Sequence, residues 1–309
     1  MANYSLKKQS PAKLNEMKDY YRKQLSTKVP EHTIFMAKKN GVTITAYKTG
    51  TVLFQGDHAE KEAGRWGGVA SQPLKGKVSS KNGDKNHLPE NFSNWSVIGS
   101  DEVGNGSYFG PVVVCACYVS AQQLPLLKEL GVKDSKMLKD KDIIKIAKDI
   151  RVSVPYQELL VTPSKYNDIQ PNYNVNRMKV ALHNQAIYLL LKKIAPTTPD
   201  GILIDQFTTE ASYRRYLSKE KNQVTDNLYI ATKGEQHHLA VAAASIICRA
   251  RFLEELEKAS KELSMTIPSG AGGTSDLAAA KILKRGGMDL LRNYAKLHFA
   301  NTQKALKKL

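Results

Sequence analysis

The sequence predicts an α/β fold, in which helices flank a mixed sheet, preceded by a smaller α+β domain. Three observations support this prediction. Strand-like runs alternate with long helical patterns after residue 95, a compact group of short strand-like runs lies near the N-terminus, and a stretch rich in Gly, Ser, Lys, Asn and Pro separates the two regions.

Residues 1–67 contain the signals of the small domain. Apolar residues at helical spacing predict a helix over 11–25, and runs of Thr, Val, Ile and Tyr between 33 and 55 predict three strands. Lys39-Asn40-Gly41 and Lys48-Thr49-Gly50 separate the runs, and Asn-Gly between alternating segments is a strong hairpin signal. We therefore expect an antiparallel meander, followed by a short helix over 58–65.

Residues 68–94 have the composition of a linker, with too little apolar surface to pack. Residues 1–90 hold 16 Lys or Arg and eight Asp or Glu, so the N-terminal part is more basic per residue than the rest. These observations divide the chain into a substrate-holding domain (1–67), a linker (68–94) and a larger domain (95–309).

The larger domain shows alternating strand-like and helical patterns. Apolar runs predict strands over 95–99, 112–119, 157–161, 201–204 and 228–232. Helical patterns cover 174–194, 238–263, 276–284 and 289–297. Strands that first occur alone and then alternate with helices indicate a mixed sheet.

The charge of the whole chain favours a polyanionic partner. The 309 residues carry 46 Lys or Arg against 29 Asp or Glu, a net charge of +17. Attraction and counterion release therefore favour nucleic acid first and an anionic membrane surface second. Neither a signal peptide nor an apolar stretch of about 18 residues is present, so we expect a cytoplasmic protein without membrane contact. Three cysteines cannot build a disulfide framework, and Cys115 and Cys117 are expected to be buried thiols.

Four acidic residues lie where a sheet could gather them. Asp101 and Glu102 close the first strand of the larger domain, Asp205 ends the apolar run GILID, and Glu235 precedes a helix of small residues. Taken singly, each could be an exposed strand end, a turn or a helix-entry acid. Taken together, they could hold the two hard divalent cations that assist phosphodiester hydrolysis.

Four segments carry a resemblance to a known family. SDEVGNGSYFGPVVV, VKDSKML, ILIDQF and KGEQHHLAVAAASIICRARFL occur in this order and resemble the signatures of the ribonuclease HII and HIII group. Asn105 and Glu235 stand where HII enzymes have Arg and Asp, and residues 1–67 resemble the TATA-box-binding-protein-like domain of HIII enzymes. The resemblance implies a ribonuclease-H-like fold and a metal-dependent endonuclease that hydrolyses the RNA strand of RNA–DNA hybrids, leaving 5′-phosphate and 3′-hydroxyl ends.

The same resemblance assigns the acidic residues. Asp101, Glu102, Asp205 and Glu235 would be the catalytic residues and the ligands of two Mg²⁺ or Mn²⁺ ions, with Asp101 bridging both. Asp226 stays open as a rival for the fourth position. Nothing in the sequence demands a dimer, so we expect a monomer.

Gly104-Asn105-Gly106 follows the acidic pair directly. Glycines let a backbone approach another chain closely, and exposed peptide groups can bond ribose 2′-hydroxyls. A plain turn is the alternative. By family position these three residues would bind substrate.

Asp134-Ser135-Lys136 also allows two interpretations. Asp and Ser are both good helix N-caps, so the segment could be a cap alone. By family position Ser135 and Lys136 would bind substrate, with Lys136 contacting phosphate.

Two alternative functions stay open: one acts on a different substrate, and the other is not catalytic. A ribonuclease HII would nick duplexes at single embedded ribonucleotides, and a non-catalytic hybrid-binding protein would not need four metal-binding acids. The retained acids and the N-terminal domain favour the HIII interpretation.

Overall fold

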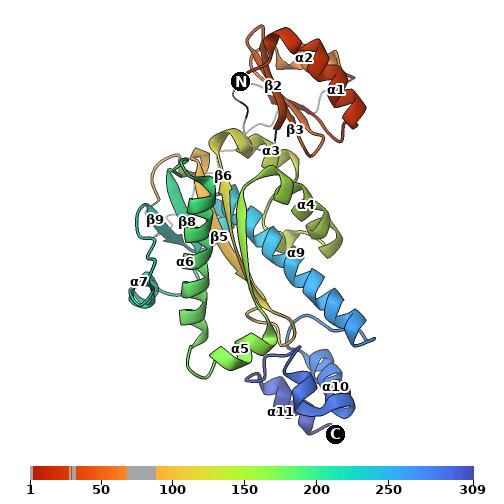
Figure 1. Ribbon diagram of the computed structural model, residues 1–309, viewed down its shortest axis with the longest axis vertical. Helices are drawn as coiled ribbons and strands as arrows, with labels where there is room; N and C mark the ends of the chain where they lie inside the picture. Colours follow the sequence, from red (N-terminus) through yellow and green to blue (C-terminus); the bar gives the residue numbers. More distant parts are fainter. Residues whose placement is uncertain (1–2, 28, 30–32, 68–87) are drawn as a thin grey trace. The chain divides into compact units, whose positions relative to one another are not determined.

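The computed structural model describes residues 3–27, 29, 33–67 and 88–309. The chain divides into two compact units (Figure 1). The first unit combines the N-terminal region up to residue 87 with residues 122–131 and 148–154, and the second contains residues 88–121, 132–147 and 155–309.

The first unit is built on an antiparallel sheet in the order β1-β4-β3-β2. Its strands are β1 (Asn3–Leu6), β2 (Thr33–Lys39), β3 (Val42–Tyr47) and β4 (Val52–Gln55). Asn40 and Gly41 have φ of 50° and 77°, the positive values that a two-residue hairpin turn requires. The predicted meander is therefore confirmed, whereas β1 was not predicted from the sequence.

Two layers cover this sheet. α1 (Pro11–Tyr20) and α2 (Ala59–Gly64) pack on one face around Phe35, Ile44 and Phe54. On the other face, Tyr47 and Leu53 contact Leu126 of α3 (Leu124–Glu129). The sequence prediction missed α3, which is only six residues long and too short for a periodic pattern to reveal.

The second unit contains a five-stranded sheet in the order β7-β6-β5-β8-β9. β5 (Val97–Val103) pairs antiparallel with β6 (Val112–Val119), which pairs antiparallel with β7 (Tyr156–Val161). On its other side β5 pairs parallel with β8 (Gly201–Asp205), and β8 pairs parallel with β9 (Leu228–Ala231). The mixed sheet predicted from the sequence is confirmed.

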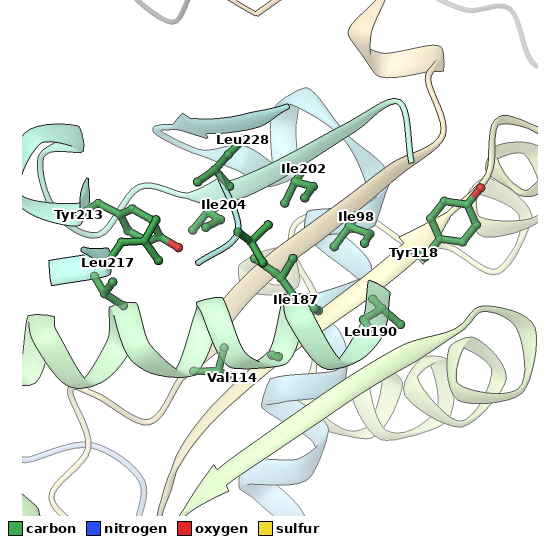
Figure 2. Packing of buried hydrophobic residues seen from close by; sticks show 14 of the residues in the cluster. Ile98, Val114, Tyr118, Ile187, Leu190, Ile202, Ile204, Tyr213, Leu217 and Leu228 are labelled. Carbon is green, nitrogen blue, oxygen red and sulfur yellow. The ribbon is translucent and has the colours of Figure 1, made fainter. Parts of the chain in front are cut away.

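Two long helices cover opposite faces of this sheet. Ile98 of β5 lies in the apolar cluster beneath α6 (Val175–Ile194), as Figure 2 shows. The next residue, Gly99, faces α9 (Leu239–Glu262), and a Cβ on it would lie 2.2 Å from the backbone nitrogen of Val241. Successive strand residues face opposite sides, so the Ala-rich helix α9 approaches the sheet closely on the face opposite α6.

The remaining helices connect and cover the ends of the sheet. They are α4 (Asp140–Ser153), α5 (Pro163–Ile169), α7 (Glu210–Leu217), α8 (Gly234–His237), α10 (Gly273–Leu291) and α11 (Ala300–Leu306).

The helix predicted over 289–297 is confirmed only as far as Leu291 and is wrong for the residues that follow. α10 continues through a kink at Gly286 and Gly287 to Leu291, and the following chain forms turns and an isolated bridge between Phe109 and Ala295. The side-chain Nδ2 of Asn167 donates hydrogen bonds to the carbonyl oxygens of Arg292 and Ala295 at 3.0 and 2.9 Å. These backbone groups therefore have hydrogen-bond partners outside a helix.

Part of the predicted linker, residues 68–87, lies outside the described residues. Phe92, within the remaining part, is 4% exposed and its ring contacts Trp95 and Tyr229. Residues 88–94 thus pack in the second unit.

Cys115, Cys117 and Cys248 are buried and form no disulfide, as expected for Cys115 and Cys117. Among the helices that the structure describes, none is long and apolar enough to cross a membrane.

Candidate active site

The two adjacent acids of β5 point to different faces of the sheet. Asp101 lies on the same face of the strand as Gly99, and its side chain is hydrogen-bonded to Ser245 of α9. Glu102 lies on the same face as Ile98, and its carboxylate contacts Lys179 and His183 of α6. Because the pair ends the strand, both side chains still reach one cleft.

That cleft has a volume of about 360 Å³ and lies in the second unit. The acids reach it from the ends of β5 and β8 and from α8, and the turn before α4 and one side of α9 complete its wall. Its lining residues are Asp101, Glu102, Val103, Asp134, Ser135, Lys136, Asp140, Asp205, Glu235, Ser245, Arg249, Phe252, Leu253 and Ser269.

Asp101 is the carboxylate most strongly opposed to ionisation. Burial, followed by the negative charges of Glu102 and Asp205, raises its pKa well above the ordinary aspartate range. The hydrogen bond from Ser245 and the one from the backbone N–H of Glu102, at 2.7 Å, only partly offset this effect. A cation in the cleft would relieve the repulsion.

Glu102 is stabilised in its charged form. Burial alone would raise its pKa, but the contacts of His183 and Lys179 outweigh burial, so the pKa of Glu102 lies below its usual value. Lys179 Nζ lies 2.8 Å from one carboxylate oxygen and His183 Nε2 lies 2.9 Å from the other. Phe207 stacks on His183 and lies under the Lys179 ammonium, and His183 Nδ1 bonds Ser100 Oγ at 2.7 Å.

Asp205 and Glu235 come together through the start of α8. Asp205 Oδ1 accepts a 2.8 Å hydrogen bond from the N–H of Gly234, the residue before Glu235. Burial raises the pKa of Asp205, and the negative charges of Glu235 and Glu102 raise it further. The hydrogen bond from Gly234 lowers it but does not cancel these effects. Lys136 Nζ lies 3.9 Å from the carboxylate of Glu235, whose side chain is 8% exposed.

The rival acid, Asp226, lies elsewhere. It is exposed in the turn before β9, accepts a 3.2 Å hydrogen bond from Thr225 Oγ, and does not line the cleft. Its position favours Glu235 as the fourth acid.

The donor set of the cleft suits a hard divalent cation. Four carboxylates supply the oxygen ligands that Mg²⁺ and Mn²⁺ prefer, and their mutual repulsion falls when a cation is added. Among the residues that the structure describes, no three acidic, His or Cys side chains already converge as a ligand group. Glu102 accounts for part of this, because both of its oxygens are occupied by Lys179 and His183.

Comparisons with known proteins agree with this geometry. The family model described as ribonuclease HII matches residues 98–302, and a domain of unknown function, DUF3378, matches residues 5–79. A ribonuclease HIII of Enterococcus faecalis is 60% identical over the full length of both chains, and one of Bacillus mycoides is 48% identical over 100% of this chain and 99% of its own. The chain belongs to the ribonuclease HII/HIII family.

The similarity extends to the fold. The crystal structure of Bst-RNase HIII in complex with Mn²⁺ superposes with a TM-score of 0.70 at 40% identity and covers 99% of each chain. The relatives named ribonuclease HIII cover the whole chain, including the N-terminal unit that the ribonuclease HII model does not match. The ribonuclease-H-like fold inferred from the four signatures is thereby confirmed.

The second ribonuclease HII/HIII signature forms a turn held against α9. Asp134 Oδ1 accepts from the N–H of Lys136 at 3.0 Å, so the predicted cap is present. Ser135 Oγ lies 2.9 Å from Ser245 Oγ, and Arg249 donates to the Ser135 carbonyl oxygen at 3.4 Å. The Lys136 side chain is 78% exposed at the mouth of the cleft.

The glycines of the first signature serve different purposes. Gly104 has φ +100°, and a Cβ there would lie 2.0 Å from the Pro111 carbonyl oxygen, so the fold itself requires glycine. Gly106 is exposed, has no positive φ, and a Cβ on it would meet nothing within 4 Å. Asn105, between them, is partly exposed.

The sequence analysis missed two residues that hold Glu102. Lys179 and His183 are four residues apart and therefore lie on one side of α6. A Lys and a His four residues apart among the apolar residues of a predicted helix are the signal that could have identified them. Ser245 and Arg249, likewise four apart on α9, also line the cleft and were not identified from the sequence.

Proposed function

We propose that the chain is a ribonuclease that hydrolyses the RNA strand of RNA–DNA hybrids with two divalent cations, Mg²⁺ or Mn²⁺, leaving 5′-phosphate and 3′-hydroxyl ends. The convergence of four carboxylates from three elements on one cleft carries the proposal. Membership of the ribonuclease HII/HIII family supplies the reaction class.

Asp101, Glu102, Asp205 and Glu235 would hold the cations. The bound ions would supply Lewis-acid activation of water and neutralise charge on the phosphate. Asp101 is central to the group because it senses the charges of both Glu102 and Asp205. Lys136, exposed at the mouth of the cleft, would contact the substrate phosphate, and Ser135, buried in the wall of the cleft beside Ser245, would bind substrate with it.

The Gly104-Asn105-Gly106 loop would contact ribose 2′-hydroxyls through its peptide groups. Gly106 supports this role, because none of the residues that the structure describes, apart from its chain neighbours, lies within 4 Å of a Cβ placed there. Close approach by a substrate backbone gives a reason for the missing side chain. Gly106→Ala should therefore fold normally and weaken hybrid binding.

The N-terminal domain, residues 1–67, would hold the duplex, and residues 68–87 of the predicted linker would join it to the catalytic domain, in which residues 88–94 also pack. Exposed lysines on its sheet and turns, such as Lys38 and Lys48, provide positive charge for phosphate contacts. Because Leu126 of α3 packs on the same sheet, removing the domain would uncover an apolar residue. Substitution in the full chain is the cleaner test.

A cleavage assay on two duplexes tests the activity. With Mn²⁺ or Mg²⁺, we expect cleavage throughout a long RNA–DNA hybrid and little on DNA that contains one ribonucleotide. Preferred nicking at the single ribonucleotide would instead support HII-type activity. Binding without cleavage of either duplex would support the non-catalytic alternative.

A salt titration tests the role of the N-terminal domain. If Lys38 and Lys48 contact phosphate, Lys38→Ala/Lys48→Ala should lower hybrid affinity and reduce the slope of log K against log salt by about 0.9 per lost contact on a B-like duplex. Lys219→Ala/Lys221→Ala removes the same charge from an exposed turn of the second unit and serves as the control. Equal slopes in the two double variants would contradict the substrate-holding role.

We further propose that the protein acts as a monomer in the cytoplasm. Light scattering on the purified chain would test the monomer, and a mass of twice the chain's 34.3 kDa would contradict it.

A further inference from the structure

Lys296 is a fully buried lysine for which the proposed reaction has no use. Its exposed fraction is 0%, and no carboxylate lies within ion-pair distance of it among the residues that the structure describes. Its Nζ donates a 2.5 Å hydrogen bond to the carbonyl oxygen of Gly110 and lies 5.8 Å from the centre of the Tyr166 ring.

The contact lies at the base of the loop that contains Gly104-Asn105-Gly106. Backbone hydrogen bonds join Gly110 N–H to the Tyr294 carbonyl at 3.0 Å and Lys296 N–H to the Tyr108 carbonyl at 2.9 Å. The Lys296 side chain thus adds a third bond to the same short bridge. The first signature is therefore bonded to the C-terminal segment at Tyr108 and Gly110, two and four residues after Gly106.

The rest of the loop is fixed on its other side. Gly104 packs against Pro111, and Gly110 lies so close to Phe252 of α9 that a Cβ would approach its ring to 2.9 Å. Ser107 Oγ accepts from the N–H of Gly270 at 2.9 Å. Asn105 is partly exposed and Gly106, at the tip, is exposed, so the position of these two residues depends on how the base is held.

A purely structural role explains this lysine poorly. A buried ammonium group without a counter-ion pays a large desolvation cost, and burial lowers the pKa of Lys296 to about 7. Methionine has a similar length and would pack in the same space without that cost.

We propose that Lys296 is a positioning residue for ribose recognition, holding the Gly110 carbonyl so that the peptide groups of Asn105 and Gly106 face the substrate. This inference rests on the proposed ribose-contacting role of that loop. Lys296 itself is buried and touches no substrate, so it acts through the backbone.

Lys296→Met tests the proposal because it removes the donor and the charge while keeping the apolar stem. We expect an unchanged or higher melting temperature, a KM for hybrid that rises roughly tenfold or more, a smaller change in kcat, and unaltered Mn²⁺ affinity by calorimetry. In an Asp101→Asn background, which should not cleave, the preference for hybrid over DNA duplex should fall. Lys304→Met, at an exposed position of α11, is the matched control and should leave all of these values unchanged.

Two further variants separate the possible failures. Lys296→Gln keeps an uncharged donor and should recover part of the preference, which also provides the test if Lys296→Met does not fold. Gly106→Ala changes the loop tip directly. If Gly106→Ala lowers the preference for hybrid while folded Lys296→Met retains wild-type KM and preference, the positioning role is overturned. If Gly106→Ala has no effect, the ribose-contacting role of the loop fails instead.

Discussion

Two lysines are buried in the second unit, and their surroundings differ in one respect. Lys179 lies beside a carboxylate, 2.8 Å from Glu102, whereas Lys296 lies beside a neutral carbonyl, 2.5 Å from the oxygen of Gly110. The first charge is balanced by the acid cluster, while the second is balanced by nothing among the described residues. Burial of Lys296 without an ion pair therefore reduces the stability of the folded chain. Burial of Lys179 in an ion pair instead makes it part of the charge balance of the cleft.

The largest expected effect concerns the acid cluster itself. Asp101→Asn keeps the side-chain size but removes a negative charge from the centre of the four carboxylates. Losing about 4 kcal/mol of cation and transition-state stabilisation would reduce turnover by roughly three orders of magnitude. Single-turnover cleavage of a hybrid measures this, and near-normal turnover would remove the assignment of the cleft as the active site.

The fourth acid should show the next largest effect. Glu235→Gln is expected to lower kcat by about a hundredfold or more, equivalent to about 3 kcal/mol. Asp226→Asn should change it by no more than roughly twofold, as for an ordinary surface substitution. The reverse order in the same cleavage assay would mean that Asp226 is the fourth ligand.

Replacing each buried lysine by Met compares the two sites directly through the free energy of unfolding. Lys179→Met leaves Glu102 buried without its cation, and breaking a buried pair in this way costs about 3–5 kcal/mol of unfolding free energy. Lys296→Met leaves only a carbonyl without its donor, a cost of about 1–3 kcal/mol that removal of the buried charge offsets. Urea unfolding in EDTA should therefore separate the two variants clearly.

A double variant serves as the control for that experiment. Lys179→Met/Glu102→Gln removes both charges of the pair and should recover most of the stability lost in Lys179→Met. Equal destabilisation by Lys179→Met and Lys296→Met would show that the presence of a counter-ion does not distinguish the two sites.

The parts of the molecule that could be predicted are those in which neighbours in sequence are neighbours in space. Asn40-Gly41 identified a hairpin because its turn geometry is local, and the period-two and helical patterns located the sheet strands and α6 and α9. The four acids were located by their family signatures, because the parallel pairing of β5 with β8 that brings Asp205 near Asp101 is not visible in any local pattern.

The parts that could not be predicted depend on long-range contacts. Residues 289–297 have helical periodicity, yet their backbone pairs with residues 108–110 and with Asn167 instead. Lys179 contacts Glu102 across 77 residues, and Lys296 contacts Gly110 across 186. Only tertiary packing reveals that either lysine is buried.

The last expected effect is the pH dependence of the Lys296 contribution to stability. The pKa of Lys296 is about 7 in the folded chain and about 10.5 when unfolded, so between these values the unfolded chain binds one more proton. Wild-type stability should therefore rise with pH relative to Lys296→Met, by about 1.4 kcal/mol per pH unit between pH 7 and 10, and should lose this contribution as the pH falls to 7. Unfolding free energies of wild type, Lys296→Met and Lys304→Met at pH 7, 8 and 9 measure the difference.

The groups that face Lys296 do not obscure this slope. Tyr166, from α5, has a pKa raised to about 12 by burial, so it stays neutral throughout the range. Burial, with a smaller effect of the Lys296 charge, lowers the pKa of His298 below its usual value and so moves its titration away from the pH range above 7. A difference between wild type and Lys296→Met that stays flat from pH 7 to 9 would mean that Lys296 keeps its proton in the folded chain. The buried ammonium would then be stabilised as effectively as the paired one at Lys179, and the contrast between the two sites would disappear.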